Sequence, residues 1–410
     1  MKQSIKKDYM MAALAIHGGK PVRDNFLVFG APDIGDEEIS EVIDCLKSGW
    51  ISTGPRVKKF EDQLKKYVGA SYSVATNSCT AAMHLCLLLS GIGPGDEVIT
   101  SPMTFGATVN VIEHVGATPV FVDIEPKGFC MNPEQIESKI TSKTRAIIPV
   151  HFAGYPCDMD SINHIANAHH LIVIEDAAHA LGTKYKHKYI GNTDHYACFS
   201  FYVSKNVSAG EGGMMTTNQP DICDKMRIYS LHGMDRHAWK RYSKTDVFHY
   251  DIVYPGYKYN MTDLNASIAI HQLNKIEAML QIRKQHIDMY NHLFIHEDSL
   301  ILPPVFDESA GSRCSWHLYP VMIKPGKLRV SRDEIMRALI HENIGVAVHF
   351  RSIIEHDFYK NKYSIPIELY PNAHFVSNNV FSLPLTSKIS ENDVRDVATA
   401  LLKVITYYKR

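Results

Sequence analysis

The chain has 410 residues, of which 43 are Lys or Arg and 44 are Asp or Glu, so its formal net charge is −1. With 45% hydrophobic and 21% charged residues, the composition is that of a globular protein and excludes disordered, collagen-like and coiled-coil classes. A chain this close to neutral has no global field that would gather nucleic acid or an anionic membrane, so we expect neither as a partner.

Short apolar runs bounded by turn residues alternate with segments of helical spacing from about residue 71 to residue 217. This pattern is typical of a parallel or mixed sheet covered by helices, which predicts a large α/β domain. The basic run 184–188 is predicted to be a solvated hairpin. The predicted strands are Tyr72–Ala75, Glu97–Ser101, Pro119–Val122, Ala146–His151, Leu171–Glu175, Tyr196–Tyr202 and Gly213–Thr216. The predicted helices between them are Thr80–Ser90, Ala107–His114 and Asp158–His169.

A long helical pattern from Leu264 to about Leu293 is predicted to bridge two domains. The pattern beyond it is that of a smaller α+β domain. We therefore predict a large domain over residues 15–290, including the N-terminal segment, and a small C-terminal domain over residues 291–410. The elements predicted for the small domain are the strands Trp316–Ile323 and Val346–Phe350 and the helices Arg332–His341 and Glu391–Tyr407.

The start of the chain and the cysteines bear on the cellular compartment. Met1–Ile16 has a basic head and a short apolar run, as a signal peptide does, but the run overlaps its own cleavage site, which argues against secretion. No apolar stretch is long enough to span a bilayer. The eight cysteines contain no C-x-x-C pair, so neither a metal site nor a disulfide framework is predicted and a reducing cytoplasm is expected.

Lys205 is the first candidate catalytic residue because it follows an apolar strand, where open α/β sheets present ligands. Burial there would favour its neutral, nucleophilic amine. Asp176 is the second, since it ends another apolar strand and could hold a proton on a heterocycle nitrogen. A lysine and an acid so arranged are what pyridoxal phosphate requires. Taken singly, Lys205 could be a surface lysine and Asp176 a cap of the next turn.

Two further segments fit the same cofactor. Ser78 and Thr80 stand at a strand-to-helix turn, where a helix N-terminus favours a phosphate, although simple capping explains them as well. Phe105 follows a strand and could stack on a flat ring, although core packing is the commoner use of a phenylalanine. The occurrence of all these residues, with Ser200, at successive strand ends favours the joint interpretation.

At this point the sequence resembles the DegT/DnrJ/EryC1/StrS aminotransferases, which are pyridoxal-phosphate enzymes of the aspartate aminotransferase fold (fold type I) acting on nucleotide-linked keto sugars. The resemblance runs over nearly the whole chain from Ala15. The segments that carry it are Gly18-Gly-Lys-Pro21, Ser48-Gly-Trp-Ile-Ser-Thr-Gly54-Pro55, the turn at 77–82, Val150-His151-Phe-Ala-Gly154, Glu175-Asp176-Ala-Ala-His179, Ser200-Phe-Tyr-Val-Ser-Lys205, Gly256-Tyr-Lys-Tyr-Asn260, Trp316-His317-Leu-Tyr319, His349-Phe350 and Ser382-Leu-Pro384.

The resemblance implies a role for each matching residue. Lys205 would bind the cofactor covalently and Asp176 would pair with its ring nitrogen, with Phe105 stacked on the ring and His179 near the ring hydroxyl. Ser78, Cys79, Thr80 and Ser200 would hold the phosphate. Lys258 and Asn260 would reach the cofactor phosphate of a second subunit, which implies a homodimer with shared active sites. Candidates for the nucleotide sugar are Trp50, Thr53, Gly54, Pro55, His317, Tyr319 and His349.

Four positions depart from the commoner family pattern. Many relatives carry Asn and Arg where this chain has Lys258 and Asn260, and the version found here resembles the branch of the 4-amino-4-deoxy-arabinose enzyme, which aminates UDP-linked sugars. His179 stands where glutamine is common. His374 stands where a glutamate is usual, which leaves the role of this position open.

The expected activity is therefore transfer of an amino group, from L-glutamate by resemblance, to a UDP-linked keto-deoxy sugar. The product would serve a cell-surface glycan, such as lipopolysaccharide, or an antibiotic sugar. A GDP-linked 4-keto-6-deoxy sugar and a C3-keto sugar are the alternatives. Four alternatives lie outside this class. A sugar dehydratase would have histidine in place of Lys205, and a regulatory relic would lack Lys205 or Asp176. The other two are a cysteine desulfurase and an enzyme with another pyridoxal chemistry.

Overall fold

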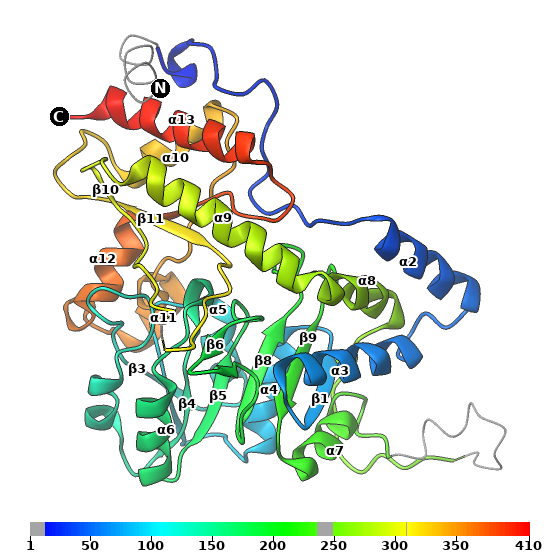
Figure 1. Cartoon of the computed structure of the whole chain (residues 1–410). Coiled ribbons are helices and arrows are strands. Elements are labelled where there is room, and N and C mark those ends of the chain that lie inside the picture. The colour runs from blue at the N-terminus through cyan, green and yellow to red at the C-terminus, as the bar shows by residue number, and fades with distance from the viewer. Residues whose placement is uncertain (1–12, 236–248, 309) are drawn as a thin grey trace.

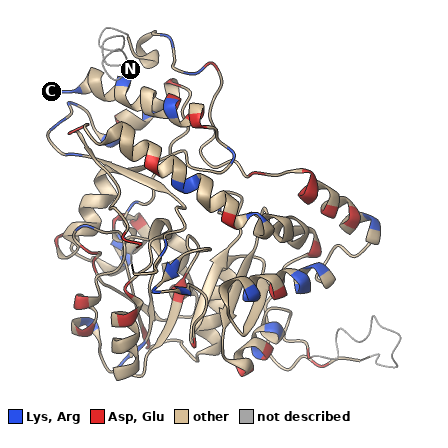
Figure 2. Cartoon of the chain, viewed as in Figure 1, with Lys and Arg blue, Asp and Glu red and all other residues tan. Residues whose placement is uncertain are grey.

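The computed structural model describes residues 13–235, 249–308 and 310–410 (Figure 1). Most of the leader-like segment at the start of the chain lies outside the described residues. Among the described helices, none is both long enough and apolar enough to cross a membrane. Figure 2 shows basic and acidic residues distributed over the helices of both parts of the chain.

A seven-stranded sheet with the order β1-β9-β8-β5-β4-β2-β3 forms the centre of the large α/β part. All seven predicted strands are present. The five strands from β8 to β3 run parallel, whereas β9 runs antiparallel to both of its neighbours, β1 and β8. The strands are β1 (Tyr72–Thr76), β2 (Glu97–Thr100), β3 (Thr118–Phe121), β4 (Thr144–Ile148), β5 (Ile172–Asp176), β8 (Tyr196–Ser200) and β9 (Gly213–Thr217).

Helices cover both faces of this sheet (Figure 1). On one face the buried side chains of α4, α5 and α7 pack against the strands. The opposite face is covered by α3, α6 and α8, and α2 packs against α8. The helices are α2 (Asp36–Ser48), α3 (Pro55–Val68), α4 (Cys79–Leu89), α5 (Gly106–His114), α6 (Met159–Ala168), α7 (Pro220–Tyr229) and α8 (Asp263–Asn274). The predicted hairpin at 184–188 is confirmed as β6 (Lys184–Tyr185) and β7 (Lys188–Tyr189).

The C-terminal part is a smaller α+β unit around a three-stranded antiparallel sheet, β10-β11-β12. Its elements, with the connecting helix α9, are α9 (Ile276–Phe294), β10 (Leu300–Ile301), β11 (Tyr319–Ile323), α10 (Arg332–His341), α11 (Asp357–Tyr363), α12 (Pro371–Asn379), β12 (Val380–Leu383) and α13 (Glu391–Tyr408). Short 3₁₀ turns lie at η1 (Ala15–His17), η2 (Pro133–Gln135), η3 (Glu137–Lys139), η4 (Phe152–Gly154), η6 (Ile353–Glu355) and η7 (Ile367–Leu369).

Three predicted elements need correction. The single helix predicted from Leu264 is two helices, because at Lys275 the backbone tightens to a bond with Gln272 and the ammonium group turns to Glu38, 2.6 Å away. The predicted strand Val346–Phe350 was wrong: among its residues only Ala347 forms a β-bridge, to Ser382. The strand predicted from Trp316 begins at Tyr319.

The N-terminal segment packs against the small C-terminal part, although the sequence analysis grouped it with the large one. Leu14 is fully buried, and the backbone N–H groups of Ala15 and Val22 donate to the Glu342 carboxylate at 3.0 and 2.9 Å. The same carboxylate forms a buried ion pair of 2.9 Å with Lys403 on α13. One buried acid therefore fixes three segments of the chain.

Replacing Glu342 with Gln is expected to lower the free energy of unfolding by about 3 kcal/mol, because the substitution leaves the Lys403 ammonium buried without a counter-charge. Urea unfolding followed by circular dichroism measures the change. As a control, Asp288→Asn breaks the exposed helical pair with Lys284 and should change stability by no more than about 0.5 kcal/mol. Equal effects of the two substitutions would show that burial of the ion pair between Glu342 and Lys403 adds nothing to the free energy of unfolding.

Candidate active site

A cavity of about 320 Å³ lies between the two parts of the chain, at the carboxyl ends of β5 and β8. Side chains from the large part and from the small part both line it, as expected for a ligand site at such an edge. The residues proposed from the sequence that line this cavity are Ser78, Cys79, Thr80, Phe105, Asp176, His179, Ser200, Lys205, His317 and His349.

The remaining candidate residues lie elsewhere in the single chain. Trp50, Thr53, Gly54, Pro55 and Asn260 line a separate recess of about 340 Å³ beside α3. The Asn260 side chain donates to the Thr53 hydroxyl at 2.6 Å, and its own oxygen is buried without a hydrogen-bond partner. Lys258 is exposed outside both cavities.

Tyr319 is not where a substrate contact would require it. Its ring is fully buried in the core of the small part, 4.8 Å from the ring centre of Tyr290, and its hydroxyl donates to Asn291 at 2.8 Å. Alternation along β11 turns this side chain into the core, away from the cavity. The expectation that Tyr319 contacts the sugar is therefore corrected.

Lys205 stands on the loop that follows β8, five residues beyond Ser200. Its backbone N–H donates to the Tyr202 carbonyl at 2.9 Å, and its side chain lines the cavity. Burial lowers the pKa of Lys205 to about 8, an effect that the nearby Asp176 carboxylate partly offsets. A substantial fraction of Lys205 is thus a neutral amine near pH 8, as a nucleophile or proton carrier requires.

Asp176 ends β5 and is 5% exposed. One carboxylate oxygen accepts the backbone N–H of Ala178 at 3.1 Å, and the other accepts the Thr108 hydroxyl at 2.6 Å. Thr108 is in turn 2.7 Å from the hydroxyl of Thr104, and both threonines are buried. Because the Thr108 proton is committed to Asp176, Thr104 donates to Thr108, and the two hydroxyls form a chain that ends on the carboxylate.

The N-terminus of α4 faces the same cavity. Ser78 caps the helix, since its hydroxyl oxygen accepts the Ala81 N–H at 3.1 Å. The Cys79 thiol is buried and donates to the Cys198 carbonyl at 3.2 Å, and burial raises the pKa of this thiol well above its ordinary value. Cys79 therefore contributes no negative charge beside the helix end, and its thiol proton is used by the Cys198 carbonyl.

Gly213, the first residue of β9, lies against this turn. A Cβ atom at Gly213 would stand 2.2 Å from the Ser78 carbonyl carbon, so only glycine permits the close approach. The first-turn N–H groups of α4, which have no backbone partner within the helix, lie at this turn beside the cavity, an arrangement that suits a phosphate.

Three histidines, His179, His317 and His349, complete the wall from both parts of the chain. Burial lowers the pKa of His179 and His317 well below the ordinary value and that of His349 to about 4. The Nδ1 atom of His179 accepts the Ala153 N–H at 3.2 Å, so its proton is on Nε2. Near neutral pH all three are uncharged.

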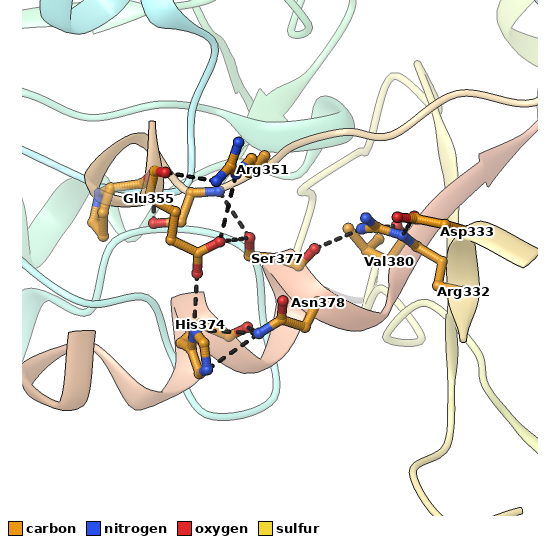
Figure 3. A network of polar contacts seen from close by, with 10 residues as sticks. Arg332, Asp333, Arg351, Glu355, His374, Ser377, Asn378 and Val380 are labelled. Carbon is orange, nitrogen blue, oxygen red and sulfur yellow. Dashed lines mark hydrogen bonds and ion pairs between the residues drawn. The ribbon is translucent and has the colours of Figure 1, made fainter. Parts of the chain in front are cut away.

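His374, whose role was left open, lies outside the cavity in a polar network of the small part (Figure 3). Its Nδ1 is 2.8 Å from a carboxylate oxygen of Glu355, and the other oxygen accepts the Ser377 hydroxyl at 2.8 Å. Glu355 ends η6, whose Ile353 N–H donates to the Pro102 carbonyl of the large part at 2.8 Å. The network therefore fixes the loop after His349.

The cavity fits pyridoxal phosphate. Lys205 offers a neutral amine, Asp176 a buried acceptor for a ring N–H, and the α4 turn a phosphate cradle. Phe105, which is 64% exposed, borders the same space. Sequence reasoning missed Thr108, three residues after Phe105, whose hydroxyl reaches Asp176. It also missed Asn206, next to Lys205, whose side-chain oxygen is 3.0 Å from His317 Nδ1.

Comparisons with known proteins agree with this geometry. The model of the DegT/DnrJ/EryC1/StrS aminotransferase family matches residues 32–402. The spore coat polysaccharide biosynthesis protein SpsC of Bacillus subtilis is 44% identical over 384 residues, which are 93% of this chain and 98% of that protein.

Two solved structures extend the likeness. The putative sugar aminotransferase Spr1654 of Streptococcus pneumoniae, solved in a PLP form, is 34% identical with a TM-score of 0.85, over 93% of this chain and 99% of that one. A PMP form of the same protein matches with a TM-score of 0.86. DesI, analysed in the presence of its TDP-sugar product, is 27% identical with a TM-score of 0.84, over 96% of each chain. The chain thus belongs to the DegT/DnrJ/EryC1/StrS aminotransferase family and is a pyridoxal-phosphate-dependent sugar aminotransferase.

Proposed function

We propose that this aminotransferase moves an amino group from L-glutamate to the C4 keto group of a UDP-linked keto-deoxy sugar. The observation that carries the proposal is the joint presence of Lys205, Asp176 and the α4 turn in one cavity. The nucleotide part is supported by DesI, which was analysed with a TDP-sugar product. A role in synthesis of a surface glycan is supported by the name of SpsC.

The roles of the protein groups follow from their placement. Bound pyridoxal phosphate supplies an electron sink that stabilises negative charge at the carbon losing its proton. Asp176 would hold a proton on the ring nitrogen through its carboxylate, which Thr108 and Ala178 orient. Lys205 would hold the cofactor through its amine and, with that amine free, would take the proton from the donor carbon and deliver it to the cofactor. In the second half-reaction it would move a proton in the opposite direction, to the sugar carbon.

The phosphate would be bound by the first-turn N–H groups at Cys79 and Thr80 with the hydroxyls of Ser78 and Ser200. Phe105 would cover one ring face, and His179 would donate from Nε2 toward the ring hydroxyl. His317 and His349, on the small part, would face the sugar.

A homodimer is part of the proposal, because four of the seven candidate substrate residues lie in the recess beside α3, away from Lys205. The buried, unpaired oxygen of Asn260 in that recess fits a donor supplied by a second copy. Sedimentation of the purified protein should give twice the monomer mass. Mixing Lys205→Ala with Asn260→Ala should restore part of the activity through hybrid dimers, and a strictly monomeric active enzyme would exclude this arrangement.

The substrate assignment is tested by absorbance with the cofactor bound. L-glutamate alone should shift the visible band toward the PMP-form spectrum, and a UDP-linked 4-keto sugar should restore the original band. GDP-linked and 3-keto sugars serve as the competing substrates. A visible band that glutamate does not change would show that glutamate is not the amino donor. Restoration of the band only by another nucleotide sugar would show that the substrate is not UDP-linked.

A further inference from the structure

Arg283 on α9 is a buried cation of unusual setting, with only 3% of its surface exposed. Its Nη1 donates to three backbone carbonyls, those of Trp316 and His317 at 3.3 Å and that of Leu385 at 2.8 Å. Its Nε is buried with no hydrogen-bond partner, and the residues that the structure describes supply it with no carboxylate. Burying a charge without a counter-charge is unfavourable. We therefore expect the positive charge of Arg283 to have a function of its own.

Two of the carbonyls bound by Arg283, those of Trp316 and His317, belong to the turn that carries His317, and the third, that of Leu385, belongs to the segment after β12. Trp316 has φ = 51°, a left-handed conformation that a bulky residue rarely adopts. On the other side of this turn the His317 N–H donates to the Ala153 carbonyl at 3.0 Å. The turn is therefore held from two sides, and the imidazole of His317 has a fixed place in the cavity wall.

Asn206, next to Lys205 in sequence, determines the tautomer of His317. Its side-chain N–H group donates to the Ser315 carbonyl at 2.8 Å, which fixes the amide so that its oxygen faces His317 Nδ1 at 3.0 Å. The amide oxygen can only accept, so His317 carries its proton on Nδ1 and leaves Nε2 as a bare acceptor for the cavity that it lines.

The charges around His317 keep its imidazole uncharged. The titratable and charged groups that face it are Lys205, Arg283, His179 and His349, none of which is an acid. Burial and these groups together lower the pKa of His317 well below its ordinary value. His179, whose ring centre is 4.3 Å away, instead carries its proton on Nε2.

We propose that Arg283 and Asn206 are positioning residues that hold His317 as an uncharged acceptor for a hydroxyl group of the sugar. This inference rests on the proposed function and narrows it: the preferred substrate has a hydroxyl, rather than a methylene or an acceptor-only group, where the sugar meets His317. An imidazolium at this place would offer two donors and no acceptor, and would lose that selection.

The first test is nitrogen NMR of histidine side chains in the full-length enzyme, with His317 assigned by its loss in His317→Gln. In the wild type, His317 should stay neutral with its proton on Nδ1 from pH 6 to pH 8. Arg283→Met removes a facing positive charge and Asn206→Asp adds a facing negative one, so both should raise the pKa of His317. A proton on Nε2 in the wild type, or an unchanged pKa in both variants, would overturn the proposal.

The second test separates this effect from simple damage. At pH 6 both variants should raise the sugar KM about tenfold or more, the loss of one hydrogen bond, while the rate of the glutamate half-reaction changes much less. Raising the pH to 8.5 should restore the KM of Asn206→Asp, because His317 then deprotonates again. A loss that persists at high pH, or an equal loss in the glutamate half-reaction, would indicate a structural role only.

Arg145→Met is the matched control, because Arg145 on β4 also donates to two backbone carbonyls, those of Ser142 and Thr144, but lies outside the cavity. It should leave the His317 pKa and the sugar KM unchanged. If no keto sugar is turned over at all, the proposed function fails, while the NMR measurement still decides whether Arg283 and Asn206 hold His317 neutral.

Discussion

Replacing Lys205 with Ala is expected to lower turnover by roughly four orders of magnitude or more, because the substitution removes both the amine that holds the cofactor and the base that moves the proton. The folded state should persist, since Lys205 lies on a cavity wall rather than in the core. Stopped-flow absorbance with L-glutamate measures both losses: the covalent cofactor band should be absent and no conversion should follow. Turnover near the wild-type rate would exclude Lys205 from both roles.

The same position predicts a pH dependence in the protein freed of cofactor. Because the pKa of Lys205 is lowered to about 8, the rate of covalent cofactor capture should rise with pH and level off above about 8. A solvated lysine would level off only near its ordinary pKa of about 10.4. Lys186, exposed on the β6–β7 hairpin and paired with Asp160, is the control position, and Lys186→Ala should leave capture unchanged.

Asp176→Asn is expected to keep the cofactor bound to Lys205 but to slow both half-reactions by roughly 10²- to 10⁴-fold. The reason is that a neutral amide cannot hold the proton on the ring nitrogen, so the ring becomes a poorer electron sink. Thr108→Val removes one hydrogen bond to the carboxylate, worth about 1.5 to 3 kcal/mol for a charged acceptor, and should give a smaller defect of the same kind.

The readout that separates these effects from lost binding is the ¹⁵N shift of the cofactor ring nitrogen, which reports its protonation directly. Wild type should show a protonated nitrogen and Asp176→Asn an unprotonated one. Asp160→Asn, an exposed acid near the hairpin, should match the wild type in shift and rate. A protonated ring nitrogen in Asp176→Asn would remove Asp176 from its proposed role.

The pair Glu175-Asp176 shows what the sequence could predict and what it could not. Two adjacent acids at a strand end were visible as a candidate site, and strand alternation places them on opposite faces. The structure shows which face is which: Asp176 lines the cavity, whereas Glu175 is buried 3.0 Å from His151 Nε2 on the other side. Asp176 was selected from its place at the end of an apolar strand, and the resemblance then implied the same role, but neither gave its hydrogen-bond partners.

The strands were predictable because each is a short apolar run bounded by turns, a purely local signal. The antiparallel direction of β9 was not, because direction depends on which neighbours a strand pairs with. The error at Val346–Phe350 has a similar origin, since only Ala347 of this segment pairs with a strand, whereas His349 and Phe350 line the cavity. The side to which the Tyr319 side chain points likewise depends on the register of β11 and was not predictable.

Residues that act through other residues escaped the sequence analysis altogether. Thr108 reaches Asp176 from 68 positions away, and Asn206 reaches His317 from 111. Neither distance leaves a trace in spacing or periodicity. Long-range hydrogen bonds of this kind become visible only when the chain is folded.

The polar network around Glu355 and the bond from Ile353 to Pro102 have a consequence for ligand affinity. They anchor the loop behind His349 and Phe350 to both parts of the chain, so this section of the wall has its final shape before a ligand arrives. Binding then requires little ordering of that loop, and more of the interaction free energy appears as affinity. Loosening the network, for instance through His374, should therefore weaken sugar binding mainly through entropy, an effect that calorimetry can resolve from a lost contact.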